Sequence, residues 1–251
     1  MRGLSVYLNA CFDSGTYPER VARAADLGAD AVDVGLWDVD DLDAVADACE
    51  DHGVELAYTS GAVGPTNDPG AVDERVAEIR DAVETAERVG CRQVNVSPGQ
   101  DLEGRDDAEQ FEAVVEVLRR AAPAAEEAGV TLLLEPLNTR VDHPGVFLSS
   151  SYEGYKILTA VDSPNAKLLF DVYHQEITEG DVVRNLRTHA DHVGHVHVAD
   201  NPGRHEPGTG EIDYEFVVSA LAETGYEGYL GCEFSPEGDP DEAVARVRDM
   251  L

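Results

Sequence analysis

Short apolar runs of strand length alternate along the chain with longer acidic segments whose apolar positions recur with helical spacing. This alternation predicts eight strands, at residues 4–8, 31–34, 54–58, 93–96, 130–134, 166–170, 193–197 and 228–232. It also predicts eight helices, at or near residues 17–27, 39–52, 71–89, 107–128, 152–161, 181–189, 214–224 and 239–250. Several of these helices are expected to end at a glycine, which suits a left-handed C-terminal cap.

Eight strand–helix units with no composition shift and no linker predict an α/β protein with one domain over residues 1–251, a (β/α)8 TIM barrel. The alternative is a doubly wound sheet, which would need a glycine-rich phosphate-binding turn after the first strand. The residues at 9–12 read N-A-C-F and contain no glycine. The sequence therefore favours the barrel.

The chain is strongly acidic, with 51 Asp and Glu against 18 Lys and Arg and a formal net charge of −33. The acids lie on every predicted helix, whereas a docking surface for a basic partner would come as a block. An even acidic coat is typical of salt-adapted proteins, because at molar salt the Debye length of about 3 Å screens the self-repulsion. Such a surface also opposes the phosphate contacts of nucleic-acid binding.

The sequence also bears on compartment and membrane contact. The four cysteines are far apart and form no CxxC pair, so they are expected to be reduced, small apolar residues. No apolar run approaches the ~18 residues that span a membrane, and the N-terminus has no signal-peptide core. We expect a soluble cytoplasmic protein without a membrane partner, and the oligomeric state, a homo-oligomer included, stays open.

Active-site groups of a (β/α)8 barrel sit at the C-terminal ends of the strands. Here strands five to eight end at Glu135, Asp171, His197 and Glu233, and the three acids lie in apolar surroundings. Because an unpartnered buried carboxylate costs roughly several kcal/mol, such acids are paired or bind metal. Three carboxylates and one imidazole favour Mn²⁺, Mg²⁺ or Co²⁺. His195 faces the same way one layer deeper and is the alternative ligand on this strand. We favour His197 as the ligand and interpret His195 as a hydrogen-bonded support.

The loop after the seventh strand has the composition of a binding loop. Residues 192–211 read H-V-G-H-V-H-V-A-D-N-P-G-R-H-E-P-G-T-G-E, so a strand opens into a loop that carries Arg204, His205 and Glu206. A guanidinium matches a carboxylate with two hydrogen bonds, which suits Arg204 to an anionic substrate. The alternative is a solvated loop in which Arg204 pairs with Glu206 or Glu211.

Five motifs in this half of the chain are similar to those of a known superfamily: L-E-P-L-N, D-V-Y-H-Q, H-V-H-V, P-G-R-H-E-P-G-T-G-E-I-D-Y and G-Y-L-G-C-E-F. Together they resemble the xylose-isomerase-like TIM-barrel superfamily, and within it the hydroxypyruvate isomerase family. The resemblance is strongest from about Glu135 to Phe234. It implies a sugar isomerase/epimerase type of enzyme that converts hydroxypyruvate to tartronate semialdehyde by enediolate proton transfer.

The resemblance also implies roles for particular residues. One divalent metal ion would be held by Glu135, Asp171, His197 and Glu233, of which the two glutamates also form the acid/base pair. The substrate would be contacted by His174 and Arg204, with Asn138 and His205 of the same motifs as further candidates. The partner implied is a small hydroxy-carbonyl acid or a sugar.

One position departs from the pattern. His197 is the form common in ketose epimerases, whereas some hydroxypyruvate isomerases have Gln there. The epimerases, however, show E-x-L-N-R-F-E after strand five, and here Val141 stands where the last acid would be. The neighbouring Arg140 suits an anionic substrate better than a neutral ketose. An epimerase or isomerase of free ketoses therefore stays as the first alternative.

Two further classes are weighed against the isomerase. A DNA-repair nuclease of the endonuclease IV type would need three zinc ions and additional histidines on strands three and four. Those strands end in Y-T-S (58–60) and N-V-S (95–97), without histidine. The last class is a binding barrel without catalysis, which would bind metal but turn over no sugar.

Overall fold

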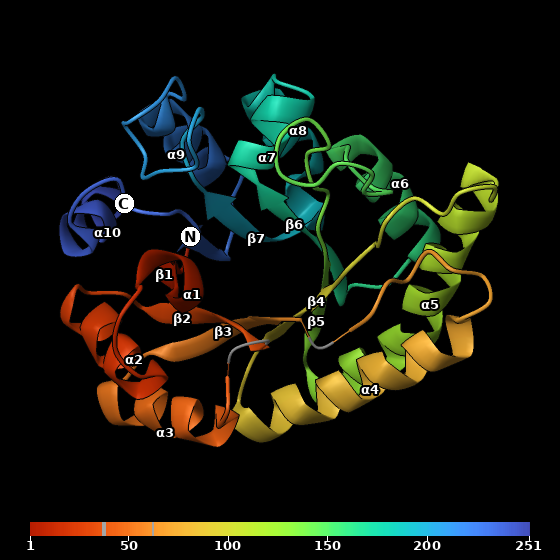
Figure 1. Cartoon of the computed structure of the whole chain (residues 1–251), viewed down its shortest axis with the longest axis horizontal. Coiled ribbons are helices and arrows are strands. Elements are labelled where there is room, and N and C mark those ends of the chain that lie inside the picture. The colour runs from red at the N-terminus through yellow and green to blue at the C-terminus, as the bar shows by residue number, and fades with distance from the viewer. Residues whose placement is uncertain (37–38, 62) are drawn as a thin grey trace.

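A computed structural model describes residues 1–36, 39–61 and 63–251 of the chain. Its eight parallel strands form a closed barrel in chain order, with β8 paired to β1 (Figure 1). The strands are β1 (Gly3–Tyr7), β2 (Ala31–Gly35), β3 (Glu55–Ser60), β4 (Gln93–Val96), β5 (Thr131–Leu134), β6 (Ala166–Asp171), β7 (Val193–Val198) and β8 (Tyr229–Cys232). The predicted (β/α)8 fold is thereby confirmed.

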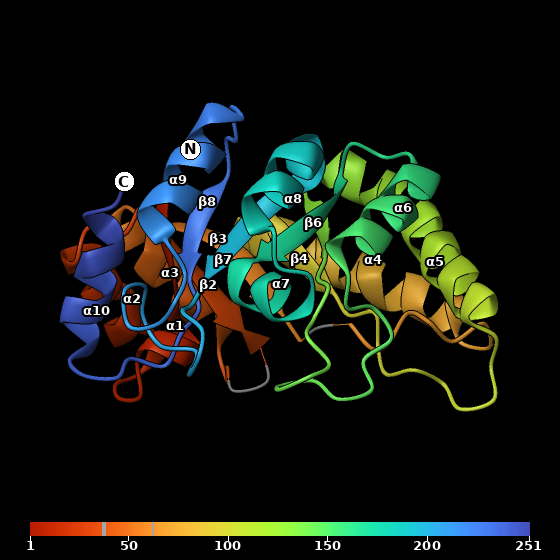
Figure 2. The ribbon, with the colours of Figure 1, turned by 90° about the horizontal axis from the view of Figure 1, so that it is seen from above.

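Each strand is followed by helix, and the helices form the outer layer around the strands, as both views of the ribbon show (Figures 1 and 2). The eight predicted helices correspond to α2 (Tyr17–Asp26), α3 (Leu42–His52), α4 (Val72–Val89), α5 (Asp107–Ala128), α6 (Ser151–Val161), α8 (Val182–His189), α9 (Tyr214–Glu223) and α10 (Pro240–Arg248). Among the described helices, none is long and apolar enough to cross a membrane.

Local signals explain where these helices begin and end. At the start of α2, Thr16 and Glu19 form a reciprocal capping box. The helices α4 and α5 end at Gly90 and Gly129, whose φ angles of 71° and 66° lie in the left-handed region that glycine adopts at little cost. The glycine ends of α4 and α5 are among those that the sequence predicted.

Among the helical elements within the described residues, three short ones were not predicted: α1 (Leu8–Cys11), α7 (Val172–Thr178) and the 3-10 turn η2 (Ala190–His192). The helix α7 starts directly after β6 because Asp171 caps it, with its side chain accepting from the backbone N–H groups of Tyr173 and His174. A cap of this kind contributes about 1 kcal/mol. It sets His174 one turn beyond the end of β6.

The apolar core is divided by the barrel wall. The main cluster of buried apolar side chains includes residues of both strands and surrounding helices, whereas Tyr7, Tyr58, Leu133 and Leu169 form a separate small cluster. Polar side chains are also fully buried on the strands, namely Ser5, Asp33, His195 and His197. Because burying polar groups costs free energy unless they are partnered, this polar centre points to function.

Candidate functional site

The four predicted metal ligands meet at the C-terminal end of the barrel. Glu135 and Glu233 follow β5 and β8, while Asp171 and His197 lie at the ends of β6 and β7. Each offers one ligand atom, and these four atoms all lie within 4.8 Å of one another. Strand register explains this, because Asp171 is paired with His197 across β6 and β7. We call Glu135, Asp171, His197 and Glu233 the quartet.

Neighbouring groups orient the carboxylates of the quartet. Asn95 on β4 donates from Nδ2 to Oε2 of Glu135 over 3.2 Å. Asp171 uses Oδ1 to cap α7, accepting from the N–H groups of Tyr173 at 2.8 Å and His174 at 3.3 Å. Its other oxygen, Oδ2, is thereby directed to the quartet.

Several buried polar atoms at this point have no hydrogen-bond partner within the described part of the chain. They include Oδ2 of Asp171 and both ring nitrogens of His197. Buried polar atoms in native proteins are nearly always satisfied, so a group of unsatisfied ones calls for an explanation. A divalent cation at the quartet would satisfy Oδ2 of Asp171 and the His197 nitrogen that faces Glu233, Nδ1, and three carboxylates with one imidazole form a donor set that such ions accept. The residues present therefore fit a metal ion.

The electrostatics of the quartet also favour a cation. Burial, reinforced by the negative charge of Glu233, raises the pKa of Glu135 to about 8. Burial likewise raises the pKa of Asp171 to about 7, although Arg204 acts against it. Burial alone would raise the pKa of Glu233 too, but Arg204 and His197 outweigh it and hold that pKa well below its usual value. A nearby positive charge stabilises the ionised form of a buried carboxylate, so a bound cation would offset the cost of ionising Glu135 and Asp171.

Arg204 is the cation that the chain itself supplies to the quartet. Its Nη2 lies 2.7 Å from Oε2 of Glu233 and 3.6 Å from Oδ2 of Asp171. Its guanidinium carbon lies 5.4 Å from the centre of the Tyr173 ring. The alternative in which Arg204 pairs with Glu206 or Glu211 is not what the structure shows.

The loop that carries Arg204 is held together by Asp200, whose side chain is fully buried. The Asp200 carboxylate accepts from the backbone N–H groups of Asn201, Gly208 and Ile212, at 2.8–3.1 Å. Arg204 itself has a φ of 56°, in the left-handed region. A carboxylate bonded at three points along one loop fixes that loop, so the position of Arg204 is well defined.

His174 reaches the quartet, and Asn138 orients it. Nε2 of His174 lies 3.6 Å from Oδ2 of Asp171, and its Nδ1 lies 2.7 Å from Nδ2 of Asn138. With the amide as donor, the ring proton of neutral His174 is on Nε2. Burial, together with Arg204, lowers the pKa of His174 to about 3, so the ring is neutral.

The structure does not bring the side chains of Asn138 and His205 to the quartet. The Asn138 amide donates to Asp142 at 2.7 Å, and its oxygen accepts from the N–H groups of Val141 and Asp142. Nδ1 of His205 lies 2.7 Å from the carbonyl oxygen of Ser235, in the loop after β8. The Asn138 amide and Nδ1 of His205 therefore bond partners outside the quartet.

Asp33 is a buried acid that the sequence interpretation missed. It lies within β2, fully buried, and its Oδ2 is 3.2 Å from Nε2 of His195 and 3.7 Å from Nε2 of His197. The signal was available, since a carboxylate inside A-V-D-V-G (31–35) has the same apolar surroundings as the predicted ligands. Asp33 lies in the middle of its strand, whereas the expectation for a barrel covers only residues at strand ends.

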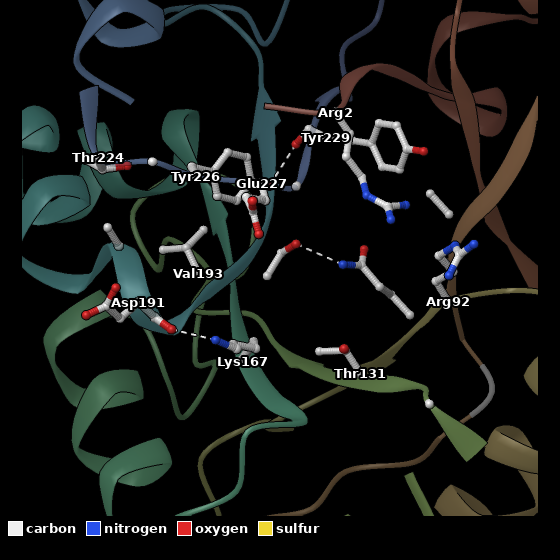
Figure 3. Close-up of a pocket in the computed structure, with 17 residues that line it drawn as sticks. Arg2, Arg92, Thr131, Lys167, Asp191, Val193, Thr224, Tyr226, Glu227 and Tyr229 are labelled. Carbon is white, nitrogen blue, oxygen red and sulfur yellow. Dashed lines mark hydrogen bonds between the residues drawn. The ribbon is translucent and has the colours of Figure 1, made fainter. Parts of the chain in front are cut away.

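A hollow of about 430 Å³ opens at the opposite, amino-terminal end of the strands (Figure 3). Three basic side chains line it, and each has a partner. Arg2 and Arg92 both pair with Glu55, while Lys167 donates to the carbonyl oxygen of Asp191. Its described lining includes none of the predicted site residues. The candidate site is therefore the quartet end of the barrel.

Comparison with known proteins places the chain in a family. The family model described as Xylose isomerase-like TIM barrel matches residues 21–251. The chain belongs to this family. This confirms the resemblance that the motifs indicated.

Three relatives illustrate the range of the family. The chain is 32% identical over 180 residues to the hydroxypyruvate isomerase of Escherichia coli, covering 72% of this chain and 69% of that protein. It is 37% identical over 194 residues to the 2-oxo-tetronate isomerase of Cupriavidus necator, covering 77% and 74%. The crystal structure of an AP endonuclease, family 2, from Brucella melitensis has a TM-score of 0.92 at 29% identity, covering 99% of both chains.

Proposed function

We propose that this protein is a metal-dependent isomerase that moves a proton between neighbouring carbons of a small hydroxy-carbonyl acid. The substrate we propose is hydroxypyruvate and the product tartronate semialdehyde. The observation that carries the proposal is the quartet with Arg204 beside it, in which four ligand atoms lie within 4.8 Å of one another. Relatives that are named isomerases of hydroxypyruvate and of 2-oxo-tetronate support the same class of reaction.

The quartet would hold the metal, since its donor atoms converge and include buried atoms without a hydrogen-bond partner in the described chain. When bound, a divalent ion supplies positive charge that stabilises negative charge developing on the hydroxyl and carbonyl oxygens of the substrate. Its identity is expected among Mn²⁺, Mg²⁺ and Co²⁺ because oxygen donors dominate the set.

Glu135 and Glu233 would transfer the proton. They come from β5 and β8 and so approach the substrate from different sides of the barrel mouth. One takes the proton from the hydroxyl-bearing carbon, and the other returns a proton to the neighbouring carbon. The hydroxyl proton passes to the former carbonyl oxygen, so that hydroxyl and carbonyl exchange places and the overall composition is unchanged. Asn95 holds Glu135 through a hydrogen bond of 3.2 Å, and Arg204 holds Glu233 at 2.7 Å. The pair is thus fixed by neighbours on β4 and on the loop after β7.

Arg204 and His174 would bind the substrate. Both ion pairs of Arg204 use Nη2, and a guanidinium has five N–H donors, so others can serve a substrate carboxylate. His174 would donate from Nε2 to a substrate oxygen, because Asn138 occupies Nδ1. We assign Asn138 the role of positioning His174 and not of contacting the substrate.

The test is metal dependence combined with a substrate panel. The protein, purified in molar salt, is stripped with a chelator and assayed with hydroxypyruvate, fructose, tagatose and psicose, before and after addition of Mn²⁺ or Mg²⁺. We expect turnover of hydroxypyruvate that is lost on chelation and restored by metal. Full activity after exhaustive chelation overturns the proposal, and turnover of the ketoses alone would assign the protein to the epimerases.

The Asp171→Asn variant tests metal binding separately from folding. Asparagine keeps the N-cap of α7 but removes one charged ligand oxygen, so we expect loss of metal binding with an intact barrel. Asp142→Asn is the matched control, because Asp142 is a nearby carboxylate that bonds Asn138 and lies outside the quartet. Equal metal affinity in Asp171→Asn and the native protein would contradict the ligand assignment.

A further inference from the structure

A buried polar cluster lies directly beneath the quartet, inside the barrel. Its centre is Oδ2 of Asp33, which accepts from Oγ of Ser5 at 2.6 Å. The same oxygen is 3.2 Å from Nε2 of His195 and 3.7 Å from Nε2 of His197. All four side chains are fully buried, so no solvent screens the contacts among them.

His197 belongs to this cluster and to the quartet at once. Its Nε2 faces Asp33 at 3.7 Å, while its Nδ1 faces Oε2 of Glu233 at 3.2 Å. The two ring nitrogens of a histidine have separate roles, and the hydrogen bond of one decides what the other can bind. The ring is therefore held between two carboxylates, of which only Glu233 belongs to the quartet.

We propose that Asp33 is a positioning residue that holds the His197 ring with Nδ1 toward the quartet and so sets the affinity of the quartet for a divalent cation. This inference rests on the proposed function, since it takes the quartet to be the metal site. Histidine ligands generally donate their second ring N–H to a carboxylate or carbonyl, which fixes tautomer and orientation. A contact of 3.7 Å is long for a hydrogen bond, but such bonds commonly tighten when a site is loaded.

The surroundings hold Asp33 in place for this task. Ser5 and His195 fix Oδ2 from two sides, and the His195 ring is stacked on Tyr58 with ring centres 5.7 Å apart. At position 231, a Cβ would come within 2.7 Å of Cδ2 of His197 and 3.0 Å of Oδ2 of Asp33. Gly231 thus leaves the space in which the His197 ring and the carboxylate meet.

The test compares Asp33→Asn with Ser5→Ala. Asparagine has the size of aspartate, but its amide can present an N–H to Nε2 of His197 and so favour the tautomer protonated on Nδ1. We expect Mn²⁺ affinity, measured by calorimetry, to fall by about 10- to 100-fold in Asp33→Asn. Ser5→Ala removes a buried bond to the same carboxylate and leaves the contact with His197, so its Mn²⁺ affinity should stay within about threefold of native.

A second measurement reads the tautomer and needs no Asp33 variant. In the native protein loaded with Mg²⁺, nitrogen NMR of labelled histidines should show His197 protonated on Nε2, with its signals assigned by their loss in His197→Gln. Protonation on Nδ1 overturns the inference, and so does native Mn²⁺ affinity in a folded Asp33→Asn. The inference is also overturned if Ser5→Ala weakens Mn²⁺ binding as much as Asp33→Asn does while the two variants are equally stable. Asp33 would then affect the metal site only through the stability of the fold.

Failure of the inference is distinguishable from failure of the proposed function. If the native protein binds no Mn²⁺, or binds it no more tightly than the Asp171→Asn variant does, the quartet is not the metal site. Both the proposed function and the role of Asp33 are then wrong. If the native protein binds Mn²⁺ through Asp171 and Asp33→Asn binds it equally well, only the role of Asp33 falls.

Discussion

Nη2 of Arg204 lies 2.7 Å from Oε2 of Glu233. This contact joins the loop after β7, which the sequence suggested as a binding loop, to one of the two glutamates proposed to move the proton. The Arg204 side chain is 27% exposed and that of Glu233 17%, so the pair is largely shielded from water. A charge-assisted hydrogen bond in such a place fixes both partners. Substrate binding and proton transfer are therefore expected to be coupled through Arg204.

Arg204→Lys should lower kcat/KM for hydroxypyruvate by at least about tenfold, which corresponds to ~1.4 kcal/mol of transition-state stabilisation. Lysine keeps the charge but cannot present a planar fork to Glu233 and a substrate carboxylate together. Steady-state kinetics at saturating metal measures the effect. Arg184→Lys is the control, because Arg184 is an exposed arginine on α8 whose partner is Asp181 and which has no assigned role in the site. An unchanged value in Arg204→Lys would show that the loop only covers the site.

The metal-free protein should lose stability as pH rises from about 6.5 to about 8.5. The folded pKa values of Asp171, about 7, and Glu135, about 8, both lie above the ordinary values of these groups. The folded state therefore binds more protons than the unfolded chain, and that stabilisation is complete only below the unfolded pKa values near 4. Burial lowers the pKa of His174 to about 3, which opposes this trend only below its unfolded value of about 6.5.

Denaturant unfolding at constant salt measures this dependence. Glu135→Gln serves as the matched variant, since an amide does not titrate, and it should flatten the decline between these pH values. Stability that rises over the same window in the metal-free native protein would contradict the prediction. Metal affinity should change in the opposite direction and increase with pH, because ligands must be deprotonated to bind.

The outline of the site could be predicted from the sequence because a barrel fixes where strand ends meet. Once eight strand–helix units were counted, the residues after strands five to eight had to lie at one mouth, and the quartet does so. The fold followed for the same reason, since the periodicities of apolar positions in strands and helices differ. Boundaries agreed to within a few residues, as in α5, predicted and found at residues 107–128.

What could not be predicted depends on contacts between residues far apart in the chain. Asp33 and His195 are separated by 162 positions and meet only inside the closed barrel. Arg204 could have paired with several acids nearby in sequence, and only the loop held by Asp200 decides that it reaches Glu233. The short helix α7 escaped prediction because its cap, Asp171, also reads as the end of a strand.

The protein should become more stable to unfolding as salt increases. The formal net charge of −33 produces self-repulsion in the compact state, and raising ionic strength from about 0.1 M to about 1 M shortens the Debye length from ~10 Å to ~3 Å. Surface ion pairs such as Arg184–Asp181, whose side chains are 78% and 56% exposed, contribute too little to reverse the trend. Thermal unfolding in a KCl series, repeated in NaCl, measures the effect. A melting temperature that stays flat or falls in both salts would contradict it.

Glu135→Gln and Glu233→Gln should each lower kcat by ~10²–10⁴ while substrate still binds. Each removes one member of the proposed acid/base pair, whereas the remaining quartet residues keep their donors. Because each glutamate is also a proposed metal ligand, the variants are assayed at saturating Mn²⁺ with the bound metal measured directly. A loss of activity that is recovered fully by more metal would assign the glutamate to metal binding alone.

Turnover in D₂O distinguishes proton transfer by these glutamates from a direct hydride shift. A carboxylic acid at the barrel mouth exchanges its proton with water, so the proton returned to carbon should come partly from solvent and the product should carry deuterium. The Glu233 side chain is 17% exposed, so its carboxyl group can exchange a proton with solvent. Mass spectrometry of product trapped by reduction measures the label, with a reaction lacking protein as the control for spontaneous exchange. In a hydride shift the hydrogen passes between carbons without meeting solvent. Product free of enzyme-dependent label under slow, single-turnover conditions would therefore contradict the two-glutamate assignment, whatever the two glutamine variants do to kcat.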